Sequence, residues 1–120
     1  MRVILVDDEA PLLKLLARYL AQLQYRVDTF TRTDDAWAAI EHDAASCHAM
    51  LLDMSMPGLE PRELGVRLLR AAPRAAVVAS SGYPADIQEL EAAGPGRVRF
   101  LQKPYSPNAL AACLHDLLKP

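Results

Sequence analysis

The sequence predicts an α/β fold with a parallel five-stranded sheet that is covered by helices on both faces. Short apolar runs alternate with amphipathic segments five times along the 120 residues. Three of these runs, residues 3–6, 50–52 and 75–79, lack polar alternation, which is typical of strands buried on both faces. Each right-handed crossover between parallel strands places a helix on one face of the sheet. Polar residues that end separate strands should therefore meet along one edge.

Length and composition limit the classes of protein to which the chain can belong. At 120 residues, 52% of them hydrophobic, we expect residues 1–120 to form one domain with no output domain. A net charge of −2 without long charged blocks argues against direct binding to nucleic acid or an anionic membrane. The first apolar run has four residues, too few for a signal peptide or a membrane span. We therefore expect a cytoplasmic protein without membrane insertion.

The two cysteines, Cys47 and Cys113, are too few for a disulfide framework. They also lack the paired spacing of a zinc site. We expect both to be small buried or half-buried side chains in a reducing compartment.

The first apolar run, residues 3–6, is a predicted strand that ends in the acidic triplet Asp7, Asp8 and Glu9. Pro11 suits the first turn of the following helix, for which we predict a length of about 13 residues. Apolar residues recur there at three- and four-residue steps: Leu12, Leu13, Leu16, Tyr19, Leu20 and Leu23.

Residues 26–30 predict a short alternating strand. Thr33 is then expected to cap a helix whose first turn carries Asp34 and Asp35, which suit the helix dipole. Ala36, Trp37 and Ile40 should face inward, with Trp37 packing in the core.

The central stretch, residues 50–58, delivers one carboxylate to the end of a buried strand. Its apolar residues lead to Asp53, and Pro57 and Gly58 break the strand soon afterwards. Ligands of open α/β sheets bind in the crevice outside the carboxyl ends of the strands. Asp53 is therefore the first candidate for a functional residue.

The next two elements are a helix and a strand that ends in hydroxyl groups. Residues 63–70 predict a helix that Pro73 stops, with Leu64, Leu68 and Leu69 inward. Residues 75–80 predict a buried strand ending in Ser80, which Ser81 follows.

The chain ends in a weak helix pattern, a strand and a stronger helix pattern. Residues 84–93 predict a short, weakly apolar helix, which we expect to be loosely held, with Ile87 and Leu90 as its apolar residues. Residues 98–101 predict the last strand, which Lys103 follows closely. Ser106 as cap and Pro107 at the first helical position should open the final helix. Its apolar face should carry Leu110, Leu114, Leu117 and Leu118.

The fold should bring together five polar residues that end four strands: Asp7, Asp8, Asp53, Ser80 and Lys103. Adjacent carboxylates repel one another, so they need a raised pKa or a cation. Oxygen ligands with room for water favour Mg²⁺ or Mn²⁺ over zinc, and Mg²⁺ commonly completes its shell with water and phosphate oxygens.

A bound phosphoryl group would explain the other polar residues at this edge. The Lys103 ammonium and the Ser80 hydroxyl could stabilise the charge of a phosphoryl group in transfer. Asp53 could act as its nucleophile and form an acyl phosphate.

The chain resembles the receiver domains of two-component response regulators over nearly its whole length. The resemblance is carried by VILVDDE at residues 3–9, LDMSMPG at 52–58, SSGYP at 80–84 and FLQKPY at 100–105. It implies a flavodoxin-like doubly wound fold with strand order 2-1-3-4-5 and five helices.

The resemblance also implies roles for individual residues. Asp53 would be the phosphoacceptor, and Asp7, Asp8 and Asp53 would bind Mg²⁺, with the backbone carbonyl of Ser55 as a further ligand. Three more residues would respond to the phosphoryl group, namely Ser80 as the switch hydroxyl, Lys103 as the phosphate-pairing lysine and Phe100 as the rotating aromatic. The Lys103–Pro104 bond would be cis.

Such a domain would accept its phosphoryl group from a histidine kinase or a histidine phosphotransfer protein. It would not be a conventional enzyme, although it would catalyse its own Mg²⁺-dependent phosphorylation and autodephosphorylation. Phosphorylation would remodel the face made by the fourth helix, last strand and last helix. This face would contact a downstream protein target and could form a homodimer.

Two positions depart from the commonest pattern of the family. Ser80 stands where threonine is more frequent, and residues 59–61 replace the usual acidic-glycine turn. Both departures bear on the partner surface and on the lifetime of the phosphoryl group. The run Ser-Gly-Tyr-Pro at residues 81–84 is similar to receivers attached to hybrid histidine kinases.

Three alternatives remain open from the sequence alone. A phosphohydrolase of the haloacid dehalogenase type would want a second acid two residues after its nucleophile, where this chain has Ser55. A flavin or nucleotide carrier would need a phosphate-binding loop after the first strand, where the acids of residues 7–9 would repel phosphate. A phosphorylation-independent interaction module would also fit.

Overall fold

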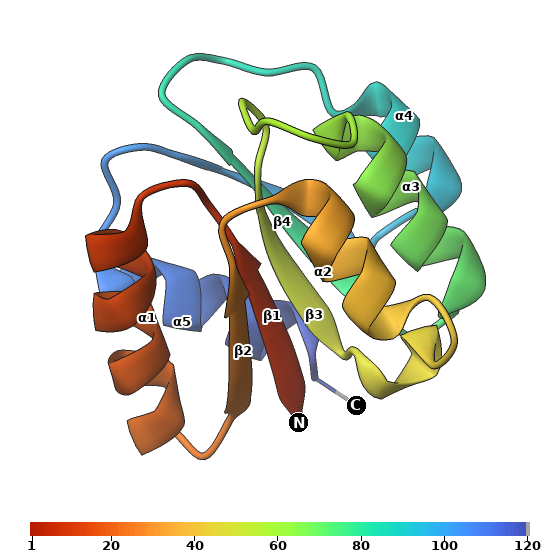
Figure 1. Cartoon of the computed structure of the whole chain (residues 1–120). Helices are drawn as coiled ribbons and strands as arrows, with labels where there is room; N and C mark the ends of the chain where they lie inside the picture. Colours follow the sequence, from red (N-terminus) through yellow and green to blue (C-terminus); the bar gives the residue numbers. More distant parts are fainter. Residues whose placement is uncertain (120) are drawn as a thin grey trace.

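The computed structural model describes residues 1–119 and contains one parallel sheet with strand order β2-β1-β3-β4-β5 (Figure 1). The strands are β1 (Arg2–Val6), β2 (Arg26–Phe30), β3 (Ala49–Asp53), β4 (Ala76–Ser81) and β5 (Val98–Gln102). The helices are α1 (Ala10–Gln22), α2 (Thr33–Ile40), α3 (Pro61–Ala71), α4 (Gln88–Ala93) and α5 (Pro107–Leu117), with a short 3₁₀ helix η1 (Ala44–Ser46). The predicted flavodoxin-like class, strand order and five helices are confirmed.

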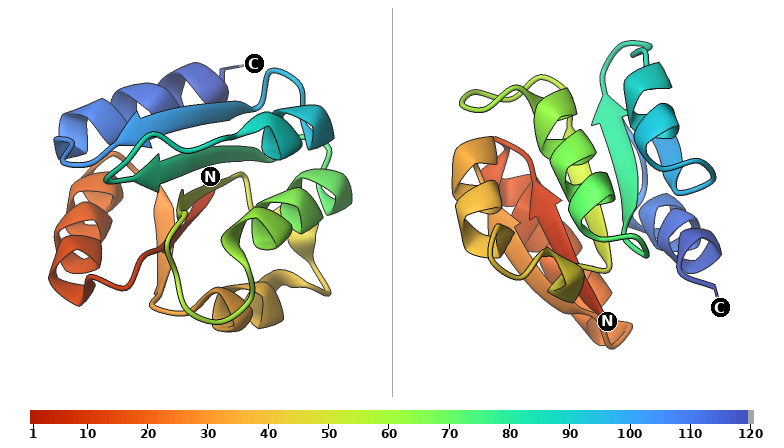
Figure 2. Two further views of the ribbon diagram at one scale, coloured as in Figure 1. Left: turned by 90° about the horizontal axis from the view of Figure 1, so that it is seen from above. Right: turned by 90° about the vertical axis from the view of Figure 1, so that its right-hand side faces the viewer.

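Helices cover both faces of the sheet (Figure 2), and each face has its own core of buried side chains. Helices α1 and α5 pack on one face, where they bury Leu13, Leu16, Leu20, Leu110 and Leu114. Helices α2, α3 and α4 pack on the other, where they bury Ala36, Ile40, Leu64, Leu68, Leu69 and Leu90. Strands β3 and β4 are buried along their whole length, which is why their sequences show no polar alternation.

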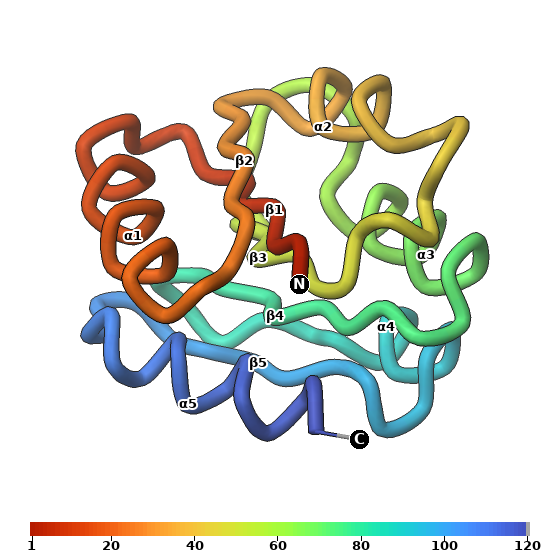
Figure 3. Tube along the Cα trace, turned by 90° about the horizontal axis from the view of Figure 1, so that it is seen from below, coloured from red at the N-terminus to blue at the C-terminus, as the bar shows by residue number. Residues whose placement is uncertain are grey.

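The register of the strands positions the polar residues that follow them. Asp53 pairs with Ser80 across β3 and β4, and Val6 pairs with Leu52 across β1 and β3. Asp7, the next residue after Val6, therefore lies beside Asp53 at the carboxyl edge of the sheet. The N-terminus lies at the other end, which Figure 3 shows from below.

The structure corrects the predicted role of Thr33. It is the first residue of α2, and Arg32 occupies the N-cap position without a side-chain capping bond. The Thr33 hydroxyl instead bonds to the carbonyls of Pro57 and Leu59. Leu23 was also wrongly placed on the apolar face of α1, because it follows the last helical residue and is exposed.

Three predicted element boundaries shift. Helix α3 starts at Pro61, two residues before the prediction, because Glu60 caps it by accepting a hydrogen bond from Glu63 N. Strand β4 covers Ala76–Ser81, one residue later than predicted. Helix α4 starts at Gln88 rather than at residue 84, because the Asp86 carboxylate accepts a hydrogen bond from Gln88 N and forms a turn there.

The predictions for Ser106, for Trp37 and for the burial of the two cysteines are confirmed. Ser106 caps α5 by accepting a hydrogen bond from Ala109 N. Trp37 packs partly buried against the core of α2, α3 and α4. Both cysteines are free, with Cys47 buried and Cys113 half-buried. Over residues 1–119, the structure has no helix with the length and apolar character to cross a membrane.

Candidate functional site

Three carboxylates meet at the carboxyl edge of the sheet. Asp7 follows β1, Asp8 is its neighbour in the chain, and Asp53 ends β3. One oxygen of each lies within 4.8 Å of the others. Asp7 and Asp53 are buried, with exposed fractions of 1% and 3%, whereas Asp8 is exposed. The cluster is therefore closed toward the sheet and open to solvent beside Asp8.

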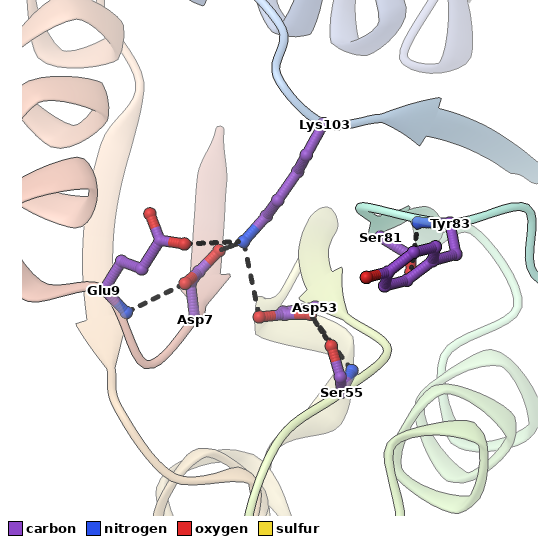
Figure 4. A network of polar contacts seen from close by, with 7 residues as sticks. All are labelled: Asp7, Glu9, Asp53, Ser55, Ser81, Tyr83 and Lys103. Atoms are coloured by element: carbon purple, nitrogen blue, oxygen red, sulfur yellow. Dashed lines mark hydrogen bonds and ion pairs between the residues drawn. The ribbon is translucent and has the colours of Figure 1, made fainter.

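Lys103 reaches this cluster from the segment that follows β5 (Figure 4). Its Nζ lies 2.8 Å from Asp7 Oδ2, 3.4 Å from Asp53 Oδ2 and 3.5 Å from Glu9 Oε1. Only 18% of the lysine side chain is exposed. A single, largely buried ammonium is thus shared by three acids.

The ionisation of these groups reflects burial and their mutual charges. Burial raises the pKa of Asp7, and the negative charge of Asp53 adds to this, although contact with Lys103 partly opposes it. Burial alone would lower the pKa of Lys103, but the hydrogen bond and charge of Asp7, together with the charges of Asp53 and Glu9, raise it. The lysine is therefore fixed as a cation, whereas the ionised form of Asp7 needs further positive charge nearby.

The two oxygens of Asp53 have different surroundings (Figure 4). Oδ1 accepts hydrogen bonds from the backbone N–H of Ser55 at 3.0 Å and from its hydroxyl at 3.1 Å. Oδ2 faces the Lys103 ammonium. The loop that begins at Met54 is also tied to β4, because Met54 N donates to Ser80 O at 2.8 Å.

Ser80 and Tyr105 place two hydroxyl groups close to this cluster. Within residues 1–119, the buried hydroxyls Ser80 Oγ and Tyr105 Oη lie close to each other but have no hydrogen bond of good geometry, whereas Asp7 Oδ2 is paired with Lys103 Nζ at 2.8 Å. Burial raises the pKa of Tyr105 to about 12, and the charge of Asp7 adds to this. Buried polar atoms are normally paired, so this concentration of unpaired atoms at one edge is suited to a polar ligand.

The donor set fits a magnesium ion. It consists of carboxylate oxygens, one of them exposed, and Mg²⁺ prefers oxygen ligands and keeps several of its waters. Within the described residues Lys103 is the one cation that contacts these acids, and burial raises the pKa of Asp7, so a further cation would stabilise the ionised carboxylates. The residues present are those of an acidic cluster typical of a receiver Mg²⁺ site.

The structure thus brings together the predicted residues Asp7, Asp8, Asp53, Ser80 and Lys103, with Ser55 directly beside Asp53. Phe100 lies one strand away on β5, half-buried against the core of α2, α3 and α4. The Lys103–Pro104 peptide bond is cis, as the resemblance implied.

Sequence reasoning missed two neighbours of the site. Glu9 ends the acidic triplet, and its contact with Lys103 could have been inferred from that position. Tyr105 follows Lys103-Pro104, but nothing in the sequence indicates that its hydroxyl is buried beside Asp7 and Lys103.

Comparison with known proteins identifies the family. The family described as the response regulator receiver domain matches residues 3–115. The transcriptional regulatory protein ResD of Bacillus subtilis is 31% identical over 98% of this chain and 48% of its own length. The positive alginate biosynthesis regulatory protein of Pseudomonas aeruginosa is 34% identical over 100% of this chain and 48% of its own length. The chain thus spans about half the length of these relatives.

A solved structure agrees with this assignment. The BeF3-activated receiver domain of DrrB from Thermotoga maritima superposes with a TM-score of 0.83 at 25% identity and covers 99% of this chain and 97% of its own. Family and fold together decide against a haloacid dehalogenase or a flavin carrier. The chain belongs to the response regulator receiver domain family, the phosphoacceptor domains of two-component signalling, and is not a conventional enzyme.

Proposed function

We propose that Asp53 accepts a phosphoryl group from a phosphohistidine and that the domain then changes its interaction surface. The observation that carries this proposal is the position of the Asp53 carboxylate, buried at the end of β3 between two further acids and the Lys103 ammonium. Such a carboxylate is held in one orientation by Ser55 and lies next to the exposed Asp8, on the side of the cluster that faces solvent.

In this proposal Asp7, Asp8 and Asp53 hold a Mg²⁺ ion, for which Mn²⁺ could substitute, with the backbone carbonyl of Ser55 as a further ligand. The bound ion would neutralise the phosphoryl oxygens and the adjacent acids. The carboxylates need this charge because Lys103 is the single cation that contacts them within the described chain.

The transfer itself uses groups of this chain. A carboxylate oxygen of Asp53 attacks phosphorus, the P–N bond of the donor breaks, and the imidazole keeps the electron pair and takes up a proton. Lys103 and the Ser80 hydroxyl stabilise the charge on the transferred group. The same residues would stabilise the charge when water attacks phosphorus, the P–O bond to Asp53 breaks and inorganic phosphate leaves, so we propose that the domain also dephosphorylates itself.

Phosphorylation adds about −2 charges at Asp53. We propose that this charge draws Lys103 and the Ser80 hydroxyl, which has no hydrogen bond of good geometry within residues 1–119, toward the phosphoryl group. Phe100 then turns into the space that Ser80 leaves. The face made by α4, β5 and α5 changes as a result and serves to bind a downstream protein or a second copy of the chain.

The donor would be a histidine kinase or a histidine phosphotransfer protein, and the cytoplasm is the expected location. The relatives ResD and the alginate regulator are named as regulatory proteins and are about twice as long as this chain. We therefore favour a role as the receiver of a regulator over attachment to a hybrid kinase, for which residues 81–84 are the only support. A single receiver domain at residues 1–120 remains our proposal for the chain itself.

The phosphoacceptor role is tested by replacing Asp53 with asparagine. Intact mass spectrometry after incubation with acetyl phosphate and Mg²⁺ should show one added phosphoryl group on the unmodified chain and none on D53N. Asp116→Asn, at an exposed position of α5, is the matched control and should be labelled normally. Stoichiometric labelling of D53N would refute the assignment. Failure of the unmodified chain with both acetyl phosphate and a phosphohistidine donor would favour a phosphorylation-independent module.

A further inference from the structure

The loop between β3 and α3 is held by a residue from another part of the chain. Thr33, at the start of α2, is fully buried. Its hydroxyl donates toward the carbonyl of Pro57 at 3.2 Å and also contacts the carbonyl of Leu59. A hydroxyl has one hydrogen to donate, so the two carbonyls share it. One side chain of α2 therefore holds two carbonyls of a loop that lies 24 and 26 residues later in the chain.

Gly58, between these two carbonyls, lies directly against α2. Its φ is +98°, and a Cβ atom there would lie 2.6 Å from Asp34 Oδ1 and 3.0 Å from Thr33 Oγ1. Any other residue would be strained at this positive φ and would have to displace the Asp34 carboxylate, so glycine suits the close approach. The contact with α2 is thus made by the backbone of the loop, which limits how far the loop can shift.

The other end of the loop is fixed at the phosphoacceptor. Ser55 donates both its backbone N–H and its hydroxyl to Asp53 Oδ1, and Met54 N donates to Ser80 O. The segment that carries the Ser55 carbonyl is therefore held by contacts at both of its ends, which we call its two anchors. One anchor is Asp53 itself, and the other is Thr33.

We propose that Thr33 is a positioning residue for the metal site, acting through the loop that carries Ser55. The inference rests on the proposed function in one respect, that the Ser55 carbonyl is a metal ligand. Mg²⁺ demands a near-ideal octahedron of ligands, so a small shift of one carbonyl weakens binding. Groups outside the ligand set that orient the ligands typically change metal affinity by about 10- to 100-fold.

The test compares Thr33→Val, which keeps the shape and removes the hydroxyl, with Thr33→Ser, which keeps the hydroxyl. Thr31→Val, at an exposed position of the same connection, is the matched control. Mg²⁺ is titrated into each protein, and the amide NMR shifts of Ser55 and its neighbours give the dissociation constant. We expect this constant to rise about tenfold in T33V and to stay close to that of the unmodified chain in T33S and T31V.

A second readout needs no metal. In the metal-free protein, amide hydrogen exchange across residues 55–59 should be faster in T33V than in T33S, because the second anchor is lost. Gly58→Ala keeps the Thr33 hydroxyl but strains the loop at a positive φ and crowds Thr33 and Asp34. It should weaken Mg²⁺ binding in the same way, and it serves as the test if T33V does not fold.

Two results would overturn the role of Thr33 alone: a T33V protein that is folded and binds Mg²⁺ as well as the unmodified chain, or a T33S protein that binds as weakly as T33V. The second result would show that the methyl group matters and the hydroxyl does not. Unchanged affinity in G58A would also count against the role. If the unmodified chain bound no Mg²⁺, both this inference and the metal site of the proposed function would be overturned.

Discussion

At the scale of single residues, the site is held in an unfavourable arrangement before any ligand binds. The buried hydroxyls of Ser80 and Tyr105 have no well-formed hydrogen bond within the described residues, whereas Asp7 Oδ2 is paired with Lys103 Nζ at 2.8 Å. A buried polar atom without a partner is destabilising by about 1–3 kcal/mol. A bound cation or phosphoryl group would supply these partners, which favours the ligand-bound form over the free one.

Lys103 has two opposed effects in such a site. It neutralises the acids of the metal-free protein, and it competes with a cation for the same oxygens of Asp7 and Asp53. We expect Lys103→Gln to lower the free energy of unfolding of the metal-free protein by about 1–3 kcal/mol, because two buried carboxylates lose their counter-charge. We expect the same variant to bind Mg²⁺ more tightly and to accept a phosphoryl group more slowly. Urea unfolding with and without Mg²⁺ measures the first two effects.

The matched control for Lys103 is Lys119, whose ion pair with Asp116 spans 3.6 Å between exposed side chains. Surface pairs of this kind contribute about 0–1 kcal/mol, so Lys119→Gln should leave both quantities nearly unchanged. A K103Q protein as stable as K119Q without Mg²⁺ would show that Asp7 and Asp53 do not depend on the ammonium.

At the scale of the elements, Arg97 joins three segments at the end of the sheet away from the site. Its Nη1 donates to the carbonyls of Ala72 and Ala75 at 2.9 and 2.8 Å. Its Nη2 donates to the carbonyl of Leu69 at 2.9 Å and reaches that of Ala93 at 3.4 Å. The guanidinium thus closes the C-terminal ends of α3 and α4, where helix carbonyls have no partner within the helix.

We expect Arg97→Ala to lower the free energy of unfolding by about 2 kcal/mol, because hydrogen bonds to a charged donor each contribute about 1.5–3 kcal/mol and water replaces some of them. Arg99→Ala is the comparison, since the Arg99 guanidinium donates only to Val98 O within the described chain. That change should stay within about 0.5 kcal/mol. Chemical unfolding of both variants measures this difference in the free energy of unfolding. Equal denaturant midpoints for R97A and R99A would contradict the stabilising role of Arg97.

The elements also show where local sequence patterns mislead. Thr33 has the residue type of an N-cap, but its hydroxyl bonds to a loop that follows β3. That partner lies too far along the chain for a capping rule to detect. The start of α4 was misplaced because the apolar pattern of residues 84–93 is weak and does not show that the Asp86 side chain forms a turn. Tertiary contacts or local side-chain bonds set each of these boundaries.

At the scale of the whole molecule, the apolar runs were sufficient to predict the sheet. Each of β1, β3 and β4 is buried on both faces, so its apolar run has no other stable position. Once these strands are parallel, their carboxyl ends must lie at one edge, and this brings Asp7, Asp53 and Lys103 together. The distances within the site, and the burial of Tyr105, depend on packing between α1, α5 and the sheet, which a pattern of residue types does not specify.

The two faces of the sheet each bury one weak acid in its neutral form. Burial raises the pKa of the Cys47 thiol to about 12, on the face of α2 and α3, and that of the Tyr105 phenol to about 12, on the face of α1 and α5. Their usual values are 9.0 and 10.0. At a pH between the pKa of such a group in the unfolded chain and its pKa in the folded protein, the unfolded chain has released a proton that the folded protein keeps. Stability therefore falls as the pH rises through this range.

We expect the free energy of unfolding to be nearly constant close to neutral pH and to decline between about pH 9 and about pH 12, by at most about 1.4 kcal/mol per pH unit for each group. Lys103 and Cys113, whose pKa values are also raised, add to this decline. Tyr105→Phe removes one of the contributing groups and should make the decline less steep, whereas Tyr19→Phe, which loses an exposed hydroxyl, should not. Urea midpoints of the three proteins over this range measure the slopes. Parallel slopes for Y105F and the unmodified chain would mean that the Tyr105 hydroxyl reaches water in the folded protein. This would contradict its buried position beside Asp7 and Ser80.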